Sequence, residues 1–170
     1  MIKNEISSID PKLPEILIYG LGNPGRQDDA LGILLVEKIE AWVKENNYSY
    51  IITDQNYQLN IEDAEYISNY DLVIFLDASV DEIESVLIEP VVPDLKTNFS
   101  MHSLTPAYIV GLCNQLFHNI PETYQLHIKG YKFEFMKPLS RNAEKNLASA
   151  FTLLTTCIQQ YLFSGSIYSN

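Results

Sequence analysis

Residues Ile16–Gly32 read ILIYGLGNPGRQDDALG, and they indicate the architecture of the whole chain. An apolar run rich in β-forming residues leads into a glycine-rich turn, and two adjacent acids, Asp28 and Asp29, then open a helical pattern. Such a run is typical of a strand that is buried on both faces of a parallel sheet. Because open α/β sheets bind ligands at the carboxyl ends of their strands, this corner is the first candidate for a functional site.

Further apolar runs and helical patterns alternate along the chain. Strands are expected at 15–21, 48–53, 71–77, 85–92 and 124–131, and helices at 30–45, 61–68, 104–117 and 141–163. The expected N-caps of the last three helices are Asn60, Thr105 and Ser140. This order predicts an α/β protein, a three-layer α/β/α sandwich of the phosphorylase/hydrolase-like type with a mostly parallel central sheet of about five strands. A strand near the end of the chain could run antiparallel.

The length of 170 residues predicts a single domain that spans 1–170. Within it we expect a polar N-terminal extension at 1–14, an α/β core at 15–163 and a frayed C-terminus at 164–170. Hydrophobic residues make up 46% of the chain, an ordinary share for a globular protein that supplies enough apolar side chains for one core.

Charge and apolar runs argue against several classes of protein. A formal net charge of −11 disfavours a nucleic-acid partner, because such a partner requires a basic face. No apolar run approaches the ~18 residues of a membrane span, and residues 1–14 contain no apolar core of a secretory signal. Cys113 and Cys157 lack the spacing of metal ligands and are expected to be buried thiols of a reducing compartment. We therefore expect a cytoplasmic protein with no membrane or nucleic-acid partner.

Polar residues stand at three positions where an expected strand ends or a helix is about to begin. They are the pair Asp28 and Asp29, then Asp77, then His102. Because the carboxyl ends of parallel strands share one edge of a sheet, we expect these positions to converge. Two carboxylates and one imidazole suit a divalent cation with open coordination positions. The dipole of the helix after His102 disfavours imidazolium, and neutral imidazole is the form that binds a metal.

Each of these positions also has a structural alternative. Asp28 is expected to cap the first helix, which leaves Asp29 as the functional acid of the pair. Asp77 could form an Asx-type turn, and His102 could hydrogen-bond to loop backbone. We interpret the two remaining histidines as structural: His118 and His127.

The glycine-rich turn Gly20–Gly25, GLGNPG, resembles the opening signature of bacterial peptidyl-tRNA hydrolases. In that family a Thr-Arg-His-Asn segment soon follows and supplies the catalytic histidine. Here residues 26–31 are RQDDAL, and the first histidine of the chain is His102, so this activity is disfavoured. The turn is also not the GxGxxG of dinucleotide sites, so no nucleotide cofactor is expected.

A second resemblance rests on three ordered motifs. The first is GNPGRQDDALG at Gly22–Gly32, the second is VIFLDA at Val73–Ala78, and the third is HSLTP at His102–Pro106. The ordered set resembles the hydrogenase maturation proteases, whose members carry Gly-Asn with a paired acid, a strand ending in Asp-Ala, and a His-Ser before a helix. The match spans roughly residues 15–160.

This resemblance implies an activity and a set of site residues. Members of the family are endopeptidases that trim the C-terminus of a nickel-loaded hydrogenase large-subunit precursor. It implies that Asp29, Asp77 and His102 are the catalytic and metal-contacting residues, and that the metal is a divalent ion, nickel, presented by the substrate. The protein partner would be the large-subunit precursor. A non-enzymatic nickel-sensing or protein-binding accessory factor of the same fold remains the alternative, and a small-molecule hydrolase using the Asp28–Asp29 corner is a third possibility.

Overall fold

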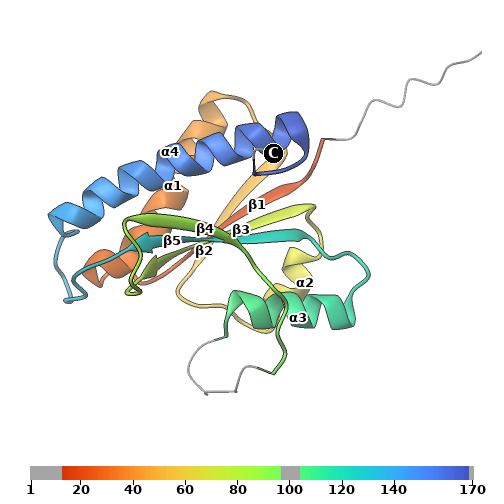
Figure 1. Cartoon of the computed structure of the whole chain (residues 1–170), viewed down its shortest axis with the longest axis horizontal. Coiled ribbons are helices and arrows are strands. Elements are labelled where there is room, and N and C mark those ends of the chain that lie inside the picture. The colour runs from red at the N-terminus through yellow and green to blue at the C-terminus, as the bar shows by residue number, and fades with distance from the viewer. Residues whose placement is uncertain (1–12, 97–103, 169–170) are drawn as a thin grey trace, which may run out of the picture.

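A computed structural model describes residues 13–96 and 104–168 of the chain. Strands and helices alternate along it, as expected from the sequence (Figure 1). The elements in chain order are β1 (Ile16–Leu21), the 3-10 helix η1 (Gln27–Ala30), α1 (Leu31–Glu45), β2 (Ile51–Asn56), α2 (Asp63–Ile67), β3 (Leu72–Ser79), β4 (Val86–Pro90), α3 (Pro106–Leu116), β5 (Glu122–Lys129) and α4 (Arg141–Ser164).

The five strands form one sheet in the order β2-β1-β3-β5-β4. The pairs β1–β2, β1–β3 and β3–β5 are parallel, and β4 runs antiparallel to β5 at the edge. The expected five-stranded, mostly parallel sheet is confirmed, and β4 is its antiparallel strand. The chain passes from β1 to β2 on one side and then returns to place β3 on the other side. This reversal makes the carboxyl ends of β1 and β3 the switch point of the sheet, where open α/β sheets bind ligands.

Helices cover both faces of the sheet and complete the expected three layers. Figure 1 shows α1 and α4 on one face and α2 and α3 on the other. Alternate residues of each strand feed the two cores, because successive side chains of a strand point to opposite faces. Ile16 and Ile18 of β1 belong to the cluster under α1 and α4, whereas Leu17 and Tyr19 belong to the cluster under α2 and α3.

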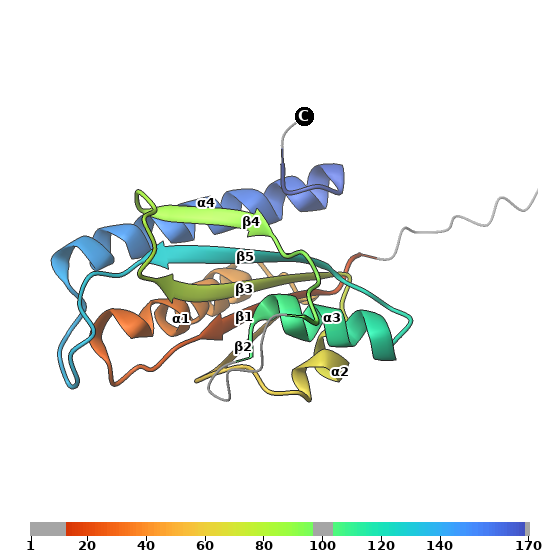
Figure 2. The ribbon, with the colours of Figure 1, turned by 60° about the horizontal axis from the view of Figure 1, so that its bottom comes forward.

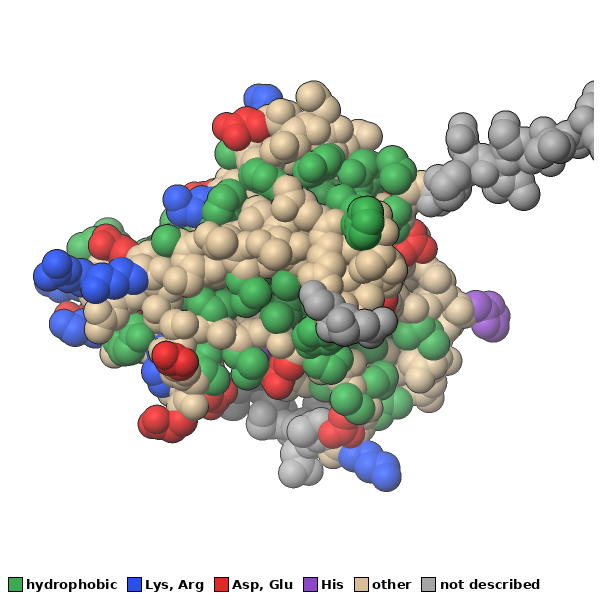
Figure 3. Space-filling model, turned by 45° about the horizontal axis from the view of Figure 1, so that its top comes forward, with side chains coloured by type: hydrophobic (Ala, Val, Ile, Leu, Met, Phe, Trp, Pro, Cys, Tyr) green, Lys and Arg blue, Asp and Glu red, His purple; other side chains and the backbone are tan. Residues whose placement is uncertain are grey.

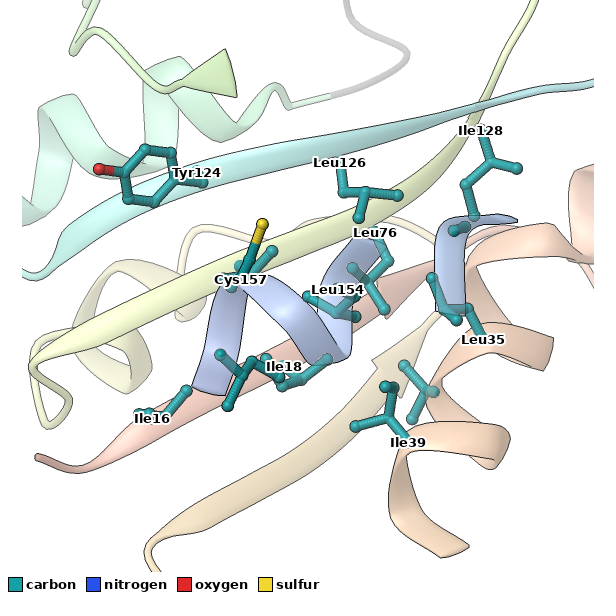
Figure 4. Close-up of a cluster of buried hydrophobic side chains, with 14 of the residues drawn as sticks. Ile16, Ile18, Leu35, Ile39, Leu76, Tyr124, Leu126, Ile128, Leu154 and Cys157 are labelled. Atoms are coloured by element: carbon teal, nitrogen blue, oxygen red, sulfur yellow. The ribbon is translucent and has the colours of Figure 1, made fainter. Parts of the chain in front are cut away.

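The larger core lies between the sheet and the helices α1 and α4 (Figure 4). Leu35 and Ile39 of α1 and Leu154 of α4 are fully buried there against Leu76 and Leu126 of the sheet. Each such side chain contributes about 1.5–3 kcal/mol when it is buried, so this layer holds the first helix firmly behind the β1 corner.

Two glycines allow α1 to begin close to the sheet. A Cβ atom on Gly32 would lie 2.3 Å from the carbonyl oxygen of Leu21 and 2.4 Å from that of Leu76, so only glycine fits between β1 and β3. Gly22 has a φ of +132°, and a Cβ atom there would lie 2.0 Å from the carbonyl oxygen of Asp29. These glycines therefore set the path of the turn that carries the paired acids.

Helix starts agree with the sequence at two of the three expected caps. The Thr105 hydroxyl accepts a hydrogen bond from the Tyr108 N–H at 3.2 Å, and the Ser140 hydroxyl accepts one from the Ala143 N–H at 3.4 Å. The prediction for Asn60 is wrong. Helix α2 is only five residues long and has no side-chain cap, and the Asn60 N–H instead donates to the Asp63 carboxylate at 2.7 Å.

Some expected bounds and faces also differ. Strand β2 begins at Ile51 rather than 48, because residues 48–50 form a turn after α1, and β3 continues past Asp77 to Ser79. Leu116 fits the apolar period of α3 but is 61% exposed, and the helix ends at this residue. Cys113 and Cys157 are buried free thiols, as expected.

Ile167 and Tyr168, which follow α4, pack against the sheet, although we expected residues 164–170 to fray. Ile167 is 3% exposed within the larger core. The Tyr168 ring meets that of Tyr124 edge-on at 5.7 Å, and its hydroxyl donates to the Ile88 carbonyl oxygen of β4 at 3.4 Å. Among the described helices, none is long and apolar enough to span a membrane.

Candidate active site at the carboxyl ends of β1 and β3

A cavity of about 340 Å³ opens at the switch point of the sheet, and two acids line it together. Asp29 comes from the turn after β1, and Asp77 comes from the last part of β3. The expected convergence of these two residues is seen directly, although they are 48 positions apart in the chain. The remaining lining residues come from four other segments: Leu21, Gly22, Tyr57, Gln58, Leu59, Leu104, Thr105, Pro106 and Gln125.

Asp77 occupies a partly desolvated position. It follows Val73 and Phe75 on the face of β3 that α3 covers, but it lies beyond the apolar core, where the cavity begins. Burial raises the pKa of Asp77 to about 7, the Ala78 N–H opposes this by hydrogen bonding, and the charge of Asp29 raises the pKa further. Two carboxylates that repel each other in one cavity form a centre that attracts a cation or a proton.

Asp28 does not cap the first helix, which corrects the role that we expected for it. Neither η1 nor α1 has a side-chain cap, and the Asp28 side chain is fully buried on the other side of the turn. One of its carboxylate oxygens accepts hydrogen bonds from the N–H groups of Tyr131 at 2.8 Å and Lys132 at 3.0 Å and from the Ser140 hydroxyl at 2.7 Å. The other accepts the Ser140 N–H at 2.7 Å.

The network around Asp28 explains why a charge is tolerated at a fully buried position. Burial alone raises the pKa of a carboxyl, but the hydrogen bonds from Ser140, Tyr131 and Lys132 outweigh it and lower the pKa of Asp28 below its ordinary value. Asp28 therefore ties the turn that carries Asp29 to the segment that joins β5 to α4. The acid next to the candidate catalytic residue is a structural anchor.

Further contacts strengthen the same tie. The Asp28 N–H donates to the Lys132 carbonyl oxygen at 3.1 Å, and the Met136 N–H donates to that of Gly25 at 2.9 Å. The side-chain oxygen of Gln27 accepts the Glu134 N–H at 3.2 Å. The turn after β1 is thus held along its length, which fixes the position of Asp29 at the cavity.

A second anchor holds the opposite wall of the cavity. The Tyr19 hydroxyl donates to the Asp63 carboxylate at 2.9 Å, and both side chains are buried. Asp63 also accepts the Asn60 N–H, so it positions the segment just after the lining residues Tyr57–Leu59. Desolvation by burial raises the pKa of Tyr19, which keeps its hydroxyl proton available for this bond.

His102, the third expected site residue, lies outside the described residues. The residues that follow it are described, and they reach the cavity. Leu104 pairs with Leu59 in an isolated antiparallel bridge, and Thr105 and Pro106 open α3 at the cavity wall. Within residues 13–96 and 104–168, no cluster of three His, Cys, Asp or Glu side chains is arranged to hold a metal ion.

Gln125 lines the cavity and was not identified from the sequence. It stands beside Phe75 in the register of β3 and β5, two residues before the His127 that pairs with Asp77. The sequence gives no signal for it, because Gln125 is one of the regular polar positions in the alternating pattern of β5. His127 meets Glu89 of β4 at 3.1 Å from Nε2 to Oε1, which agrees with the structural role expected for it.

Comparison with known proteins finds solved structures that share this fold. No protein-family model and no curated protein sequence matches the chain. The hydrogenase maturation protease HycI from Thermococcus kodakarensis superposes with a TM-score of 0.67 at 20% identity, over 83% of this chain and 90% of that one. The maturating endopeptidase HybD from E. coli gives 0.63 at 20% identity, over 86% and 93%. A further endopeptidase from Escherichia coli gives 0.67 at 22% identity, over 89% and 94%. The chain therefore has the fold of the hydrogenase maturation proteases, the family that its three motifs resemble.

Proposed function

We propose that this protein is an endopeptidase that removes a C-terminal peptide from a nickel-loaded hydrogenase large-subunit precursor. The observation that carries the proposal is that Asp29 and Asp77 line one cavity at the switch point of the sheet. They are the two described residues among the three that the sequence motifs assign to the site. Solved structures of hydrogenase maturation proteases share the fold of this chain, which supports a role of the same kind.

The two carboxylates suit both parts of such a reaction. Oxygen ligands with open positions fit a divalent cation, and here the cation is nickel that the precursor brings as part of the substrate. Holding that ion would fix the precursor tail in the cavity, so that one peptide bond lies beside the acids. His102 would complete the ligand set.

Hydrolysis then requires proton transfer, which a carboxylate of this site can perform. The oxygen of a water molecule adds to the scissile carbonyl carbon while a carboxylate accepts the proton of that water. The carbon–nitrogen bond breaks, and the proton passes to the leaving nitrogen. A carboxyl whose pKa is about 7, as for Asp77, exchanges protons readily near neutral pH, which is the property that acid–base catalysis needs. No nucleotide takes part, and the reaction belongs in the cytoplasm.

The decisive experiment is incubation of the purified protein with a nickel-loaded large-subunit precursor, followed by measurement of the precursor mass. The wild-type protein should remove a single C-terminal peptide. Asp29→Asn, Asp77→Asn and His102→Ala should each reduce the rate by at least about 100-fold, because each removes a group that contacts the ion or the reacting atoms. Asp81→Asn is the matched control, since Asp81 is an exposed acid just after β3 whose carboxylate accepts a hydrogen bond from the Ser79 hydroxyl.

A non-enzymatic accessory factor is the second candidate, because the carboxylates of Asp29 and Asp77 could bind a cation without cleaving the precursor. Calorimetry with nickel separates the two functions. Nickel or precursor binding that is lost in Asp29→Asn, with no change in precursor mass, would favour the accessory factor. Unchanged precursor mass without any binding would contradict both.

A further inference from the structure

The positive charges of this acidic protein gather at one end of the molecule. Side chains of Lys and Arg crowd the left end in Figure 3, where α4 begins. The exposed basic residues of this end come from the turn after β1 and from the segment around the start of α4: Arg26, Lys132, Lys137, Arg141 and Lys145. In the described part of the chain, no carboxylate forms a salt bridge with any of them. The basic end is therefore free to attract negative charge.

Large apolar side chains are exposed at the same end. Phe135 is 70% exposed and Met136 is 89% exposed, and both lie in the segment between β5 and α4. Apolar side chains of this size that are rimmed by charges are characteristic of protein-binding surfaces. We call Arg26, Lys132, Phe135, Met136 and Lys137 together the 132–137 surface.

The 132–137 surface is held in one shape. The Arg26 guanidinium lies over the rings of Phe133 and Phe135, at 5.7 and 5.9 Å from their centroids, and its Nε donates to the Phe133 carbonyl oxygen at 3.2 Å. The backbone on either side is fixed by Asp28 at Lys132 and by Gly25 at Met136. A preformed surface loses little conformational entropy when a partner binds.

The same contacts place this surface beside the candidate active site. Arg26 is three residues before Asp29 in the turn that forms one wall of the cavity. In Figure 2 the arrowheads of β3 and β5 point toward the end of the molecule where α4 begins, so the strand ends and the basic end coincide. If the C-terminal tail of a substrate protein entered the cavity, the folded part of that protein would lie against the 132–137 surface.

We propose that the 132–137 surface docks an acidic segment of the substrate protein that also presents an apolar side chain. This inference rests on the proposed function, and it adds the chemistry by which the substrate is recognised outside the cleaved tail. The basic end attracts an acidic segment, while the net charge of −11 repels it elsewhere, so the substrate arrives in one orientation. Phe135 and Met136 supply the apolar contact that holds it.

A nucleic acid is the less favourable occupant of the same end. One face of the Phe135 ring is taken by Arg26, Glu134 stands among the basic residues, and the rest of the chain carries excess negative charge. Stacking of bases requires free aromatic faces beside a continuous basic groove. Nucleic-acid binding is therefore an outcome that the test must detect, and it would contradict the proposal.

The test compares variants that change the same charge at two places. Lys132→Glu/Lys137→Glu alters the proposed surface, and Lys38→Glu/Lys44→Glu alters two exposed lysines of α1 by the same amount. Processing of the nickel-loaded precursor should show a KM at least about tenfold higher for the first variant with kcat unchanged, and less than about twofold higher for the second. The wild-type KM should rise as salt is increased from about 50 to about 300 mM, because salt screens the attraction between the basic surface and the acidic segment. The KM of the first variant should rise less, because that attraction has already been removed.

A second variant tests the apolar contact without altering charge. Met136 has a φ of +56°, a conformation that asparagine tolerates, so Met136→Asn removes the apolar side chain without straining the backbone. It should raise KM severalfold and leave the thermal unfolding midpoint within a few degrees of the wild type.

The outcomes separate this proposal from the proposed function. Processing by the wild type with unchanged KM in both surface variants would overturn the docking surface and leave the endopeptidase function standing. Absence of processing by the wild type would overturn the endopeptidase function. Calorimetric measurement of precursor binding would then test the docking surface alone, and loss of binding in Lys132→Glu/Lys137→Glu would support this surface. If the wild type binds tRNA, and Lys132→Glu/Lys137→Glu alone loses tRNA binding while it still binds the precursor, the surface would be assigned to nucleic acid and the docking proposal would be wrong.

Discussion

Two neighbouring aspartates at the β1 corner occupy different surroundings although they are adjacent in the chain. Asp28 is fully buried and accepts four hydrogen bonds from the segment between β5 and α4, whereas Asp29 lines the cavity. A motif of two adjacent acids therefore combines an anchor with an acid that lines the cavity. The first acid determines where the second one stands.

Asp28→Asn should lower the free energy of unfolding at pH 7 by about 3 kcal/mol, because a buried amide cannot accept all the hydrogen bonds that the carboxylate accepts. The folded-state pKa of Asp28 lies below its ordinary value. Its stabilising effect is thus complete above the ordinary carboxyl pKa and is lost as pH falls through the folded pKa. Urea unfolding at pH 7 and again at pH 2 measures both effects. An equal loss of stability at the two pH values would contradict this role.

The pKa of Asp77 should respond to its neighbour. Asp29→Asn removes one negative charge from the cavity, so the pKa of Asp77 should fall from about 7 while staying above its ordinary value, since burial is the larger cause. Titration of the Asp77 carboxyl carbon by NMR measures the shift. Asp81→Asn should leave that pKa unchanged, and a pKa that is the same in Asp29→Asn would show that the two acids do not interact.

The site residues differed in how far the sequence could identify them. That Asp29 and Asp77 would line one cavity was predictable, because each comes directly after an apolar run and parallel strands end on one edge of a sheet. The role of Asp28 was not, because its partners lie more than 100 positions away and a cap is the common role of an acid before a helix. Gln125 was hidden for a similar reason, since its place beside the cavity depends on the pairing of β5 with β3.

At the scale of elements, the contact of α1 with the sheet controls the geometry of the site. The helix begins where Gly32 touches the carbonyl oxygens of Leu21 and Leu76, so β1, β3 and α1 meet at one point. Both acids of the cavity lie within three residues of this contact, Asp29 before Gly32 and Asp77 after Leu76. A small displacement of α1 would therefore separate them.

Gly32→Ala should lower the free energy of unfolding by at least about 2 kcal/mol and reduce processing of the precursor, because the added methyl group collides with two backbone oxygens that cannot rotate away. Thermal unfolding and the processing rate measure the two effects. Ser149→Ala, at an exposed position of α4, should change stability by less than about 0.5 kcal/mol. Wild-type stability in Gly32→Ala would mean that α1 can move off the sheet without cost.

Element types were predictable from periodicity, whereas their pairing was not. Apolar runs marked β1 and β3, and caps marked α3 and α4, because these signals act over a few residues. The order β2-β1-β3-β5-β4 depends on contacts between distant segments that leave no local pattern. The length of α2 was overestimated, because the chain forms turns at both ends of this helix. The N–H groups of Asp63 and Ser68 donate to the carbonyl oxygens three residues earlier, those of Asn60 and Glu65.

At the scale of the whole molecule, opposite charges are placed side by side at one end. Under the two proposals, the acidic cavity would hold a cation and the basic 132–137 surface would bind an acidic segment of the substrate. A nickel-loaded protein with acidic segments presents both features, so the two regions would act on one substrate without competing. We therefore expect a candidate precursor to carry an acidic segment on its surface near the tail that is cleaved.

The short segment after α4 bears on how this protein behaves at high concentration. Strand β4 is an open edge of the sheet, and such edges invite pairing with another chain and eventual aggregation. Here Pro90 removes one N–H group from the edge, and the Tyr168 hydroxyl occupies the Ile88 carbonyl oxygen. Ile167→Ala/Tyr168→Ala should lower the free energy of unfolding by about 2–4 kcal/mol. It should also increase self-association, as measured by sedimentation, because the β4 edge is then less covered. If the variant self-associates no more than the wild type, Pro90 is enough to protect the edge. Otherwise Ile167 and Tyr168 are what keep the sheet from pairing with its own copies.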